Sequence, residues 1–129
     1  MKKRVFQLKT FVRWAKKILS DEQLCAAALE IMRGQYEADL GKGLCKKRIA
    51  VEGQGKRGAT RTLVAKEGAN GLFFMAGRQK SEPGSDFSDA NVALAQLLGQ
   101  ALQVASHLKL DALIAEGVLK EICHDCPQN

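Results

Sequence analysis

Apolar and polar residues alternate in several short stretches of the chain, some of them rich in β-branched side chains. This pattern is typical of half-buried strands and predicts four of them, at residues 4–8, 44–51, 60–66 and 72–79. A further short strand is expected at 118–122. The link at 67–71 is short and contains glycine, so we expect the strands on either side of it to form an antiparallel hairpin.

Other stretches repeat their apolar residues every three or four positions, as helices do. One helix is expected to start at Thr10. A second is expected to begin at Ser20, where Ser20 and Gln23 fit a capping box, and to end at Gly34. A short helix is expected at 110–116.

The strongest helical signal follows Ser88. Leucines and alanines keep to one face of this helix, and we expect that face to pack on the sheet as core. The residues concerned are Leu94, Leu97, Leu98, Ala101, Leu102, Ala105 and Leu108.

The order of these elements predicts an α+β fold. We expect a small, mainly antiparallel sheet with two N-terminal helices and a long C-terminal helix packed on one side of it. A length of 129 residues suits one domain with its own core. That domain is expected at 1–122, with 108–122 as a C-terminal extension and 123–129 as a flexible tail.

Composition narrows the class of protein. A hydrophobic content of 46% with only 2 prolines is typical of a folded chain rather than a disordered one. No apolar stretch reaches the roughly 18 residues of a membrane span, so we expect a cytosolic protein with no membrane partner. Cys123 and Cys126 have the spacing of half a zinc site, but the chain offers no second half. We therefore expect a reduced tail, and neither a metal nor a cofactor.

Charge is distributed unevenly along the chain, although its net value is only +6. Residues 1–17 and 42–61 are strongly basic, whereas acidic residues outnumber basic ones from Glu82 onward. A chain polarised in this way presents a positive surface to an anionic partner, most often nucleic acid.

The cations of the central strands are candidates for that surface. Alternation places Lys46 and Arg48 on one face of their strand and Lys47 on the other. If the three central strands are neighbours, the cations of the strands at 60–66 and 72–79 converge on one concave patch beneath a glycine-rich basic loop. The loop supplies Lys56 and Arg57, and the strands supply Arg61, Arg78 and Lys80.

Such a patch binds a phosphodiester, and cations placed around a phosphate stabilise the charge that develops when it is attacked. RNA brings its own nucleophile, the 2′-hydroxyl. Crowded cations also lower the pKa of a lysine, so that one lysine can serve as general base. Charge alone leaves two non-catalytic alternatives open. In one the cations bind a nucleic-acid backbone, and in the other they bind an acidic partner protein.

Three adjoining segments resemble a known family. They are KKRIA at 46–50, the loop GQGKRG at 53–58 and TRTLV at 60–64. With them, the sequence resembles the RelE/HigB-like toxins of bacterial type II toxin-antitoxin systems from about Arg4 to Leu102. The opening VFQLKTFVRWAKK and the segment 38–43 look like the HigB-like branch.

The resemblance implies a compact RelE-like fold and metal-independent cleavage of messenger RNA, usually on the ribosome. It also implies a cognate antitoxin and a toxin-antitoxin hetero-oligomer. Carried over by position, the catalytic residues would be Arg61, Lys47, Lys56 and Lys80. The RNA-binding residues would be Lys46, Arg48, Arg57 and Arg78.

The chain departs from the family pattern near the end of the last central strand. Residues 80–82 read Lys-Ser-Glu where relatives commonly have Lys-Asn-Glu or Lys-Arg-Glu, and the turn Pro-Gly-Ser follows at 83–85. Phe87 lies nearest the place where some members have a tyrosine, and Tyr36 is the chain's one tyrosine. Two rival functions therefore stand beside the nuclease: a degenerate toxin that binds RNA or the ribosome without cleavage, and a ParE-like inhibitor of DNA gyrase.

Overall fold

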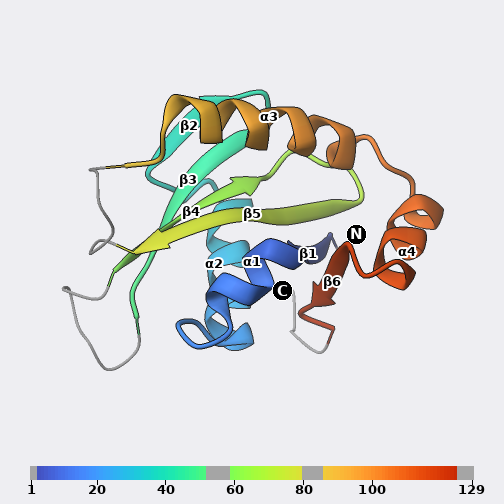
Figure 1. The fold of residues 1–129 in the computed structure, drawn as a ribbon, viewed down its shortest axis with the longest axis horizontal. Helices are drawn as coiled ribbons and strands as arrows, with labels where there is room; N and C mark the ends of the chain where they lie inside the picture. The colour runs from blue at the N-terminus through green and yellow to red at the C-terminus, as the bar shows by residue number, and fades with distance from the viewer. Residues whose placement is uncertain (1–2, 52–58, 80–85, 125–129) are drawn as a thin grey trace.

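The computed structural model describes residues 3–51, 59–79 and 86–124 (Figure 1). The elements follow in the order β1 (Arg4–Leu8), α1 (Lys9–Ala15), α2 (Asp21–Met32), β2 (Ala38–Gly41), β3 (Leu44–Ile49), β4 (Thr60–Ala65), β5 (Gly71–Gln79), α3 (Asp89–Gln103), α4 (His107–Ala115) and β6 (Leu119–Ile122). The α+β class predicted from the sequence is confirmed. None of the helices in the described ranges is long and apolar enough to cross a membrane.

The strands form one mixed sheet of six, in the order β2-β3-β4-β5-β1-β6. β1 runs parallel to β5, and every other neighbouring pair in this sheet is antiparallel. The predicted hairpin of β4 and β5 is confirmed. The sheet is larger than expected because β2, a strand of only four residues, adds an edge strand beside β3. At the other edge the expected C-terminal extension supplies α4 and β6, and β6 pairs with β1.

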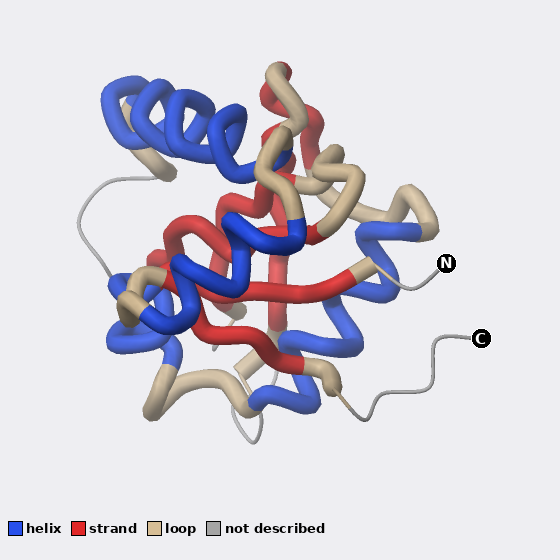
Figure 2. Tube along the Cα trace, turned by 90° about the vertical axis from the view of Figure 1, so that its right-hand side faces the viewer, coloured by secondary structure: helices blue, strands red, loops and turns tan. Residues whose placement is uncertain are grey.

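Helices cover both faces of the sheet, not one face as expected from the sequence (Figures 1 and 2). α1 and α2 pack against a core that includes Cys45 and Val64. α3 and α4 pack against a second core on the opposite face, which includes Leu63 and Phe73. The reason lies in the central strands. β4 and β5 are buried on both parities, as Leu63 and its neighbour Val64 show, so each face of the sheet needs a cover.

Three of the helices begin at a serine that caps the first turn. Ser20 and Gln23 form the predicted capping box, in which each side chain bonds the other residue's backbone N–H at 3.1 Å. Ser88 caps α3 and Ser106 caps α4, each accepting a backbone N–H at 3.1 Å. α1 differs from expectation because it starts at Lys9, directly after β1, and Thr10 is not its cap.

α3 packs on the sheet through small residues rather than through Leu94, Leu97 and Leu98. Ala95 and Gly99 are its buried residues, and a Cβ built on Gly99 would lie 3.1 Å from the Cβ of Ala65. Leu97 is 66% exposed, and Leu94, Leu98 and Leu108 are exposed too, so the expectation that these leucines belong to the core is wrong. The close approach allowed by Ala95 and Gly99 turns the outer leucines toward solvent. Of the expected face, Leu102 and Ala105 do pack against the second core.

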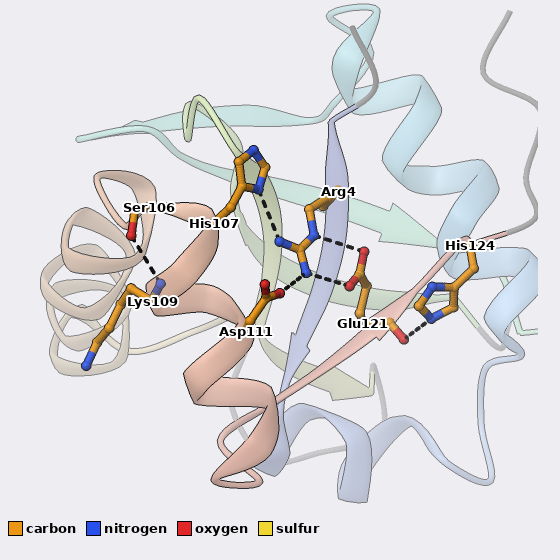
Figure 3. Close-up of polar contacts among 7 residues, drawn as sticks. All are labelled: Arg4, Ser106, His107, Lys109, Asp111, Glu121 and His124. Atoms are coloured by element: carbon orange, nitrogen blue, oxygen red, sulfur yellow. Dashed lines mark hydrogen bonds and ion pairs between the residues drawn. The ribbon is translucent and has the colours of Figure 1, made fainter.

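The end of the chain is tied to the fold at two places. Cys123 forms a disulfide with Cys25 of α2, so the expectation of a reduced cysteine at this position is wrong. Arg4 of β1 bonds both carboxylate oxygens of Glu121 in β6, at 2.8 and 3.1 Å, and also Asp111 of α4 at 2.7 Å (Figure 3). These contacts join β1, α4 and β6 across more than 100 residues of sequence.

Candidate functional site

Three arginines lie in line across the central strands. In the register of the sheet Arg48 of β3 is opposite Arg61 of β4, and Arg61 is opposite Arg78 of β5. Directly paired residues point to the same face, and here it is the face covered by α3, because Leu63 shares the parity of Arg61. Lys46 lies two residues before Arg48 on that face. We call Lys46, Arg48, Arg61 and Arg78 the basic patch.

The spacing of the arginines follows from sheet geometry. Neighbouring strands lie about 4.8 Å apart, so three adjacent strands carry the arginines over about 10 Å. Arg48 is exposed, while Arg61 and Arg78 are half-buried. Arg61 occupies the middle of the row, with an arginine on either side. A guanidinium group offers paired N–H donors, so the row can hold successive oxygens of an anionic ligand.

An acidic residue from another element lies against the basic patch. The carboxylate of Asp86, just before α3, forms an ion pair with Lys46, and its backbone carbonyl accepts a hydrogen bond of 2.6 Å from Nη1 of Arg78. The pKa of Asp86 lies below its ordinary value, mainly because Lys46 donates a hydrogen bond to it, with a contribution from the charge of Arg61. Three cations of the patch therefore act on this residue.

Comparison with known families identifies the family of the chain. The model of the RelE toxin of the RelE/RelB toxin-antitoxin system matches residues 3–122. This chain belongs to the RelE toxin family. Toxins of this family are paired with an antitoxin protein, which is therefore the partner of this RelE-family toxin. No curated protein matches the chain at a significant level.

Lys47 is not part of the patch of this RelE-family toxin. It pairs with Thr62, on the opposite face of the sheet from Arg61. Its Nζ lies 2.8 Å from the carboxylate of Glu30 and donates a hydrogen bond of 3.0 Å to the carbonyl of Gln35. With only 6% of its surface exposed, Lys47 joins the end of α2 to the sheet and does not reach a ligand on the other face. The catalytic role expected for it is therefore abandoned.

The remaining predicted site residues divide into two groups. The structure brings Lys46, Arg48, Arg61 and Arg78 together on one face of the toxin. Lys56, Arg57 and Lys80 lie outside the described residues, so their roles stay predictions.

A groove runs from the patch along α3. Its volume is about 280 Å³, and its lining includes Arg78, Phe87, Leu94 and Leu98. Phe87, the residue nearest the place of the tyrosine found in some relatives, also packs against the second core. An aromatic side chain thus borders the patch, but it lacks a hydroxyl group.

A second hollow, of about 460 Å³, lies on the other face between α2 and the sheet. Lys66 lines it, but two carboxylates lie close to its Nζ, Asp39 at 3.3 Å and Glu67 at 3.2 Å. Lys3 also lines it, and burial lowers the pKa of this lysine. The positive charge of Lys66 is balanced by these carboxylates, so this hollow is a weaker candidate for an anion than the basic patch.

The two histidines lie away from the basic patch. Nδ1 of His107 in α4 is 3.1 Å from Nη1 of Arg4, and His124, after β6, contacts the carbonyl of Glu121 (Figure 3). The carboxylates around Arg4, Glu121 first, raise the pKa of this arginine. Arg4 therefore joins β1 to α4 and β6 and stabilises the fold. Among residues 3–51, 59–79 and 86–124, no three His, Cys, Asp or Glu side chains form a group able to hold a metal ion.

Sequence reasoning missed Asp86. It counted this residue only among the acids of the C-terminal part, because no local pattern links it to a lysine 40 positions earlier. One signal was present: Asp86 is only 8 positions after Arg78 in the sequence, so it can lie close to the end of the strand that carries Arg78.

Proposed function

We propose that this toxin is an endoribonuclease that cleaves messenger RNA without a metal ion and thereby inhibits translation. The observation that carries the proposal is the row of Arg48, Arg61 and Arg78 across β3, β4 and β5. Guanidinium groups are well suited to phosphodiesters, since each can bond two phosphate oxygens at once. Membership of the RelE family supports the same function.

The proposed reaction uses the nucleophile of the substrate. The 2′-oxygen of a nucleotide attacks the adjacent phosphorus, and the bond from phosphorus to the 5′-oxygen breaks. A base takes the proton of the 2′-hydroxyl, and the departing 5′-oxygen gains a proton. The products are a 2′,3′-cyclic phosphate and a 5′-hydroxyl. Negative charge builds on the phosphate during attack, and cations already fixed by the sheet stabilise it without reorganisation.

Arg61 is the proposed stabiliser of that charge. It is the central arginine of the row, so a phosphate bound to it lies within reach of the cations on both neighbouring strands. Lys46, Arg48 and Arg78 are proposed to hold the RNA backbone. The charge-assisted bonds of such contacts are stronger than those between neutral groups.

The general base is proposed among the lysines of the two segments that border the patch in sequence. Lys56 precedes β4 and Lys80 follows β5, and a lysine next to several arginines loses its proton more readily than an isolated one. Arg57 is proposed as a further contact to RNA.

The test compares the toxin with Arg61→Ala and with the matched control Arg13→Ala, which removes an exposed arginine of α1. Each protein is added to a translation reaction, and transcripts are mapped by primer extension. We expect new 5′ ends with the parent and the control, and a loss of about 100-fold or more with Arg61→Ala. Intact transcripts with the parent protein would remove the enzymatic proposal.

The proposed setting is the ribosome, as the family resemblance implies. Its test is the same primer extension on naked RNA, with and without added ribosomes. We expect cleavage to require ribosomes. Equal cleavage of naked RNA would leave the nuclease proposal in place and reject its dependence on the ribosome.

One observation favours a second candidate, a toxin that binds RNA without cutting it. Phe87 borders the groove beside the patch and has no hydroxyl to donate a proton or a hydrogen bond. This alternative predicts RNA binding that depends on Arg61 together with unbroken transcripts. A filter-binding assay run beside primer extension separates the two candidates.

A further inference from the structure

The groove along α3 joins the basic patch at Arg78, and the proposed reaction leaves it unused. Binding of a phosphate alone needs only the cations of the patch. The groove adds about 280 Å³ of space beside them, lined by β5, α3 and the junction of β1 with α1. Because Arg78 is paired with Arg61 in the sheet, a phosphate held at Arg61 has the groove next to it.

Most of the lining of this groove suits a flat, largely apolar ring. Met75 and Ala76 of β5 contribute apolar surface, as do Leu94 and Leu98 of α3. Phe87 adds an aromatic side chain, a group on which the bases of single-stranded RNA stack. Such a lining favours the faces of a nucleobase over water, but it does not distinguish one base from another.

Two polar side chains of the lining can make that distinction. Thr10 of α1 and Asn91 of α3 are both exposed. Ser88 caps α3 by accepting the backbone N–H of Asn91, so the side-chain amide of Asn91 takes no part in the cap. This amide carries a donor beside an acceptor. Adenine has the complementary pair in its amino group and a neighbouring ring nitrogen, which makes asparagine a common partner of this base.

We infer that the groove along α3 is a nucleobase site, in which Asn91 contacts the edge of the base next to the phosphate held by the basic patch. The inference rests on the proposed function in one respect, because it takes RNA as the ligand of the patch. A purely apolar ligand fits less well. It would bring no anionic group to Arg78 and no polar edge to Asn91, whereas a base linked to a phosphate brings both.

The test uses strands that bind but cannot be cut. Strands of five 2′-deoxynucleotides lack the hydroxyl group that the proposed reaction needs. Their central position carries adenine, another base or no base, and the other four positions carry no base. Fluorescence anisotropy measures the affinity of each strand for the full-length toxin. We expect the adenine strand to bind about 10-fold more tightly than the strand without a base and about 10-fold more tightly than the strands with other bases.

Asn91→Ala tests the contact with the edge of the base. We expect this variant to bind the strand without a base as the parent does, while its preference for adenine over the other bases falls below about twofold. Gln100→Ala is the matched control and should keep the full preference, because Gln100 is an exposed amide of α3 that does not line the groove. Arg61→Ala should weaken the binding of every strand by the same factor, since its proposed ligand is the phosphate.

Asn91→Asp supplies a second variant that keeps the size of the side chain and suits the first turn of a helix. A carboxylate accepts hydrogen bonds but donates none, so the preference for adenine should fall here too. The preference is a ratio within one protein, and the added charge therefore cancels from it. Equal affinity of the parent for strands with and without a base, full preference in a folded Asn91→Ala protein, or no binding of any strand would overturn the nucleobase site.

These strands separate the site from the reaction. A toxin that leaves transcripts intact but prefers the adenine strand through Asn91 refutes the nuclease alone. A toxin that cleaves RNA and binds all the strands equally well refutes the nucleobase site alone.

Discussion

Arg48 and Arg61 lie directly opposite each other on β3 and β4, so two guanidinium groups face the same side of one pair of strands. Like charges at opposed positions disfavour strand pairing, by an energy of about 0.2–1 kcal/mol. Arg78 extends the arrangement to a third strand. Binding of an anionic ligand explains this row of arginines better than a contribution to stability does, because functional sites commonly lower the stability of a protein.

Arg61→Ala is the first prediction. Because Arg61 has an arginine on each side, losing its charge should change the free energy of unfolding by less than about 1 kcal/mol. Urea denaturation followed by circular dichroism measures this change, and primer extension measures activity on the same sample. A variant that is both inactive and destabilised by several kcal/mol would show a structural role rather than a role at the phosphate.

Lys46 and Lys47 form a natural pair for the second prediction, because they are neighbours in sequence on opposite faces of β3. Lys47→Ala removes the buried partner of Glu30, and since that carboxylate is half exposed we expect a cost of about 1–3 kcal/mol. Lys46→Ala should cost less than about 1 kcal/mol and weaken RNA binding.

Urea denaturation and filter binding with both lysine variants measure this contrast. Lys47→Met, which keeps the stem of the side chain, should recover part of the lost stability. Weaker RNA binding by a folded Lys47→Met protein would return Lys47 to the site.

The central strands and the alignment of Arg61 with Arg78 were predictable from the sequence, whereas the face of β3 that joins them was not. Alternation sets the parity of each side chain, so the sequence pattern alone separates Lys46 and Arg48 from Lys47. The short link between β4 and β5 made them neighbours, which aligned Arg61 with Arg78. The local sequence pattern was sufficient to align Arg61 with Arg78 because the two residues lie on adjacent strands of one hairpin.

The position of α3 was not predictable in the same way. Periodicity identifies an apolar face but does not say which apolar residues meet the sheet. Leu97 looked like core, whereas Ala95 and Gly99 make the contact because they allow closer approach. Asp86 and the Cys25–Cys123 pair were missed for another reason. The disulfide joins cysteines 98 residues apart, and no local signal reports such a pairing.

Asp86→Asn is the third prediction. The change removes the carboxylate that pairs with Lys46, so it adds one net positive charge to the patch. We expect tighter RNA binding and a steeper salt dependence, with the slope of log affinity against log salt increasing by up to about 1. Fluorescence anisotropy at several salt concentrations measures both. Asp111→Asn is the control, since Asp111 lies on α4 and pairs with Arg4 of β1 rather than with a cation of the basic patch.

The lowered pKa of Asp86 adds a dependence on pH. A carboxylate with a depressed pKa stabilises the fold above its unfolded pKa, and this stabilisation is lost as pH falls through the lower folded value. The parent should therefore be more stable than Asp86→Asn at neutral pH, with the difference disappearing below pH 3.8, the ordinary value for aspartate. A difference in stability between the two proteins that persists unchanged at acidic pH would contradict the pairing of Asp86 with Lys46.

Reactivity of Cys45 is the fourth prediction. This cysteine has no exposed surface, and burial raises the pKa of its thiol to about 12. The thiolate is the reactive form, so Cys45 should resist iodoacetamide at pH 8 in the folded protein and react after denaturation. Mass spectrometry of the alkylated peptide checks this, in a Cys126→Ser background that removes the other cysteine outside the disulfide. Rapid alkylation of the native protein would show that this part of the core opens readily.

The disulfide is the basis of the fifth prediction. Cys25 and Cys123 close a loop of 98 residues that contains almost the whole sheet. Closing a loop of that length restricts the unfolded chain by about 4–5 kcal/mol in the chain-entropy model, and removing a native disulfide costs about 2–5 kcal/mol. We therefore expect Cys25→Ser, Cys123→Ser and reduction by dithiothreitol to lower the free energy of unfolding by the same amount.

Urea denaturation with and without reductant measures the loss. The double variant Cys25→Ser/Cys123→Ser is the control, because it should match either single variant and should not respond to dithiothreitol. RNA binding should be preserved in the reduced protein, since Cys25 lies on α2, across the sheet from the basic patch. Equal stability of the oxidised and reduced toxin would mean that the two cysteines are not joined in solution.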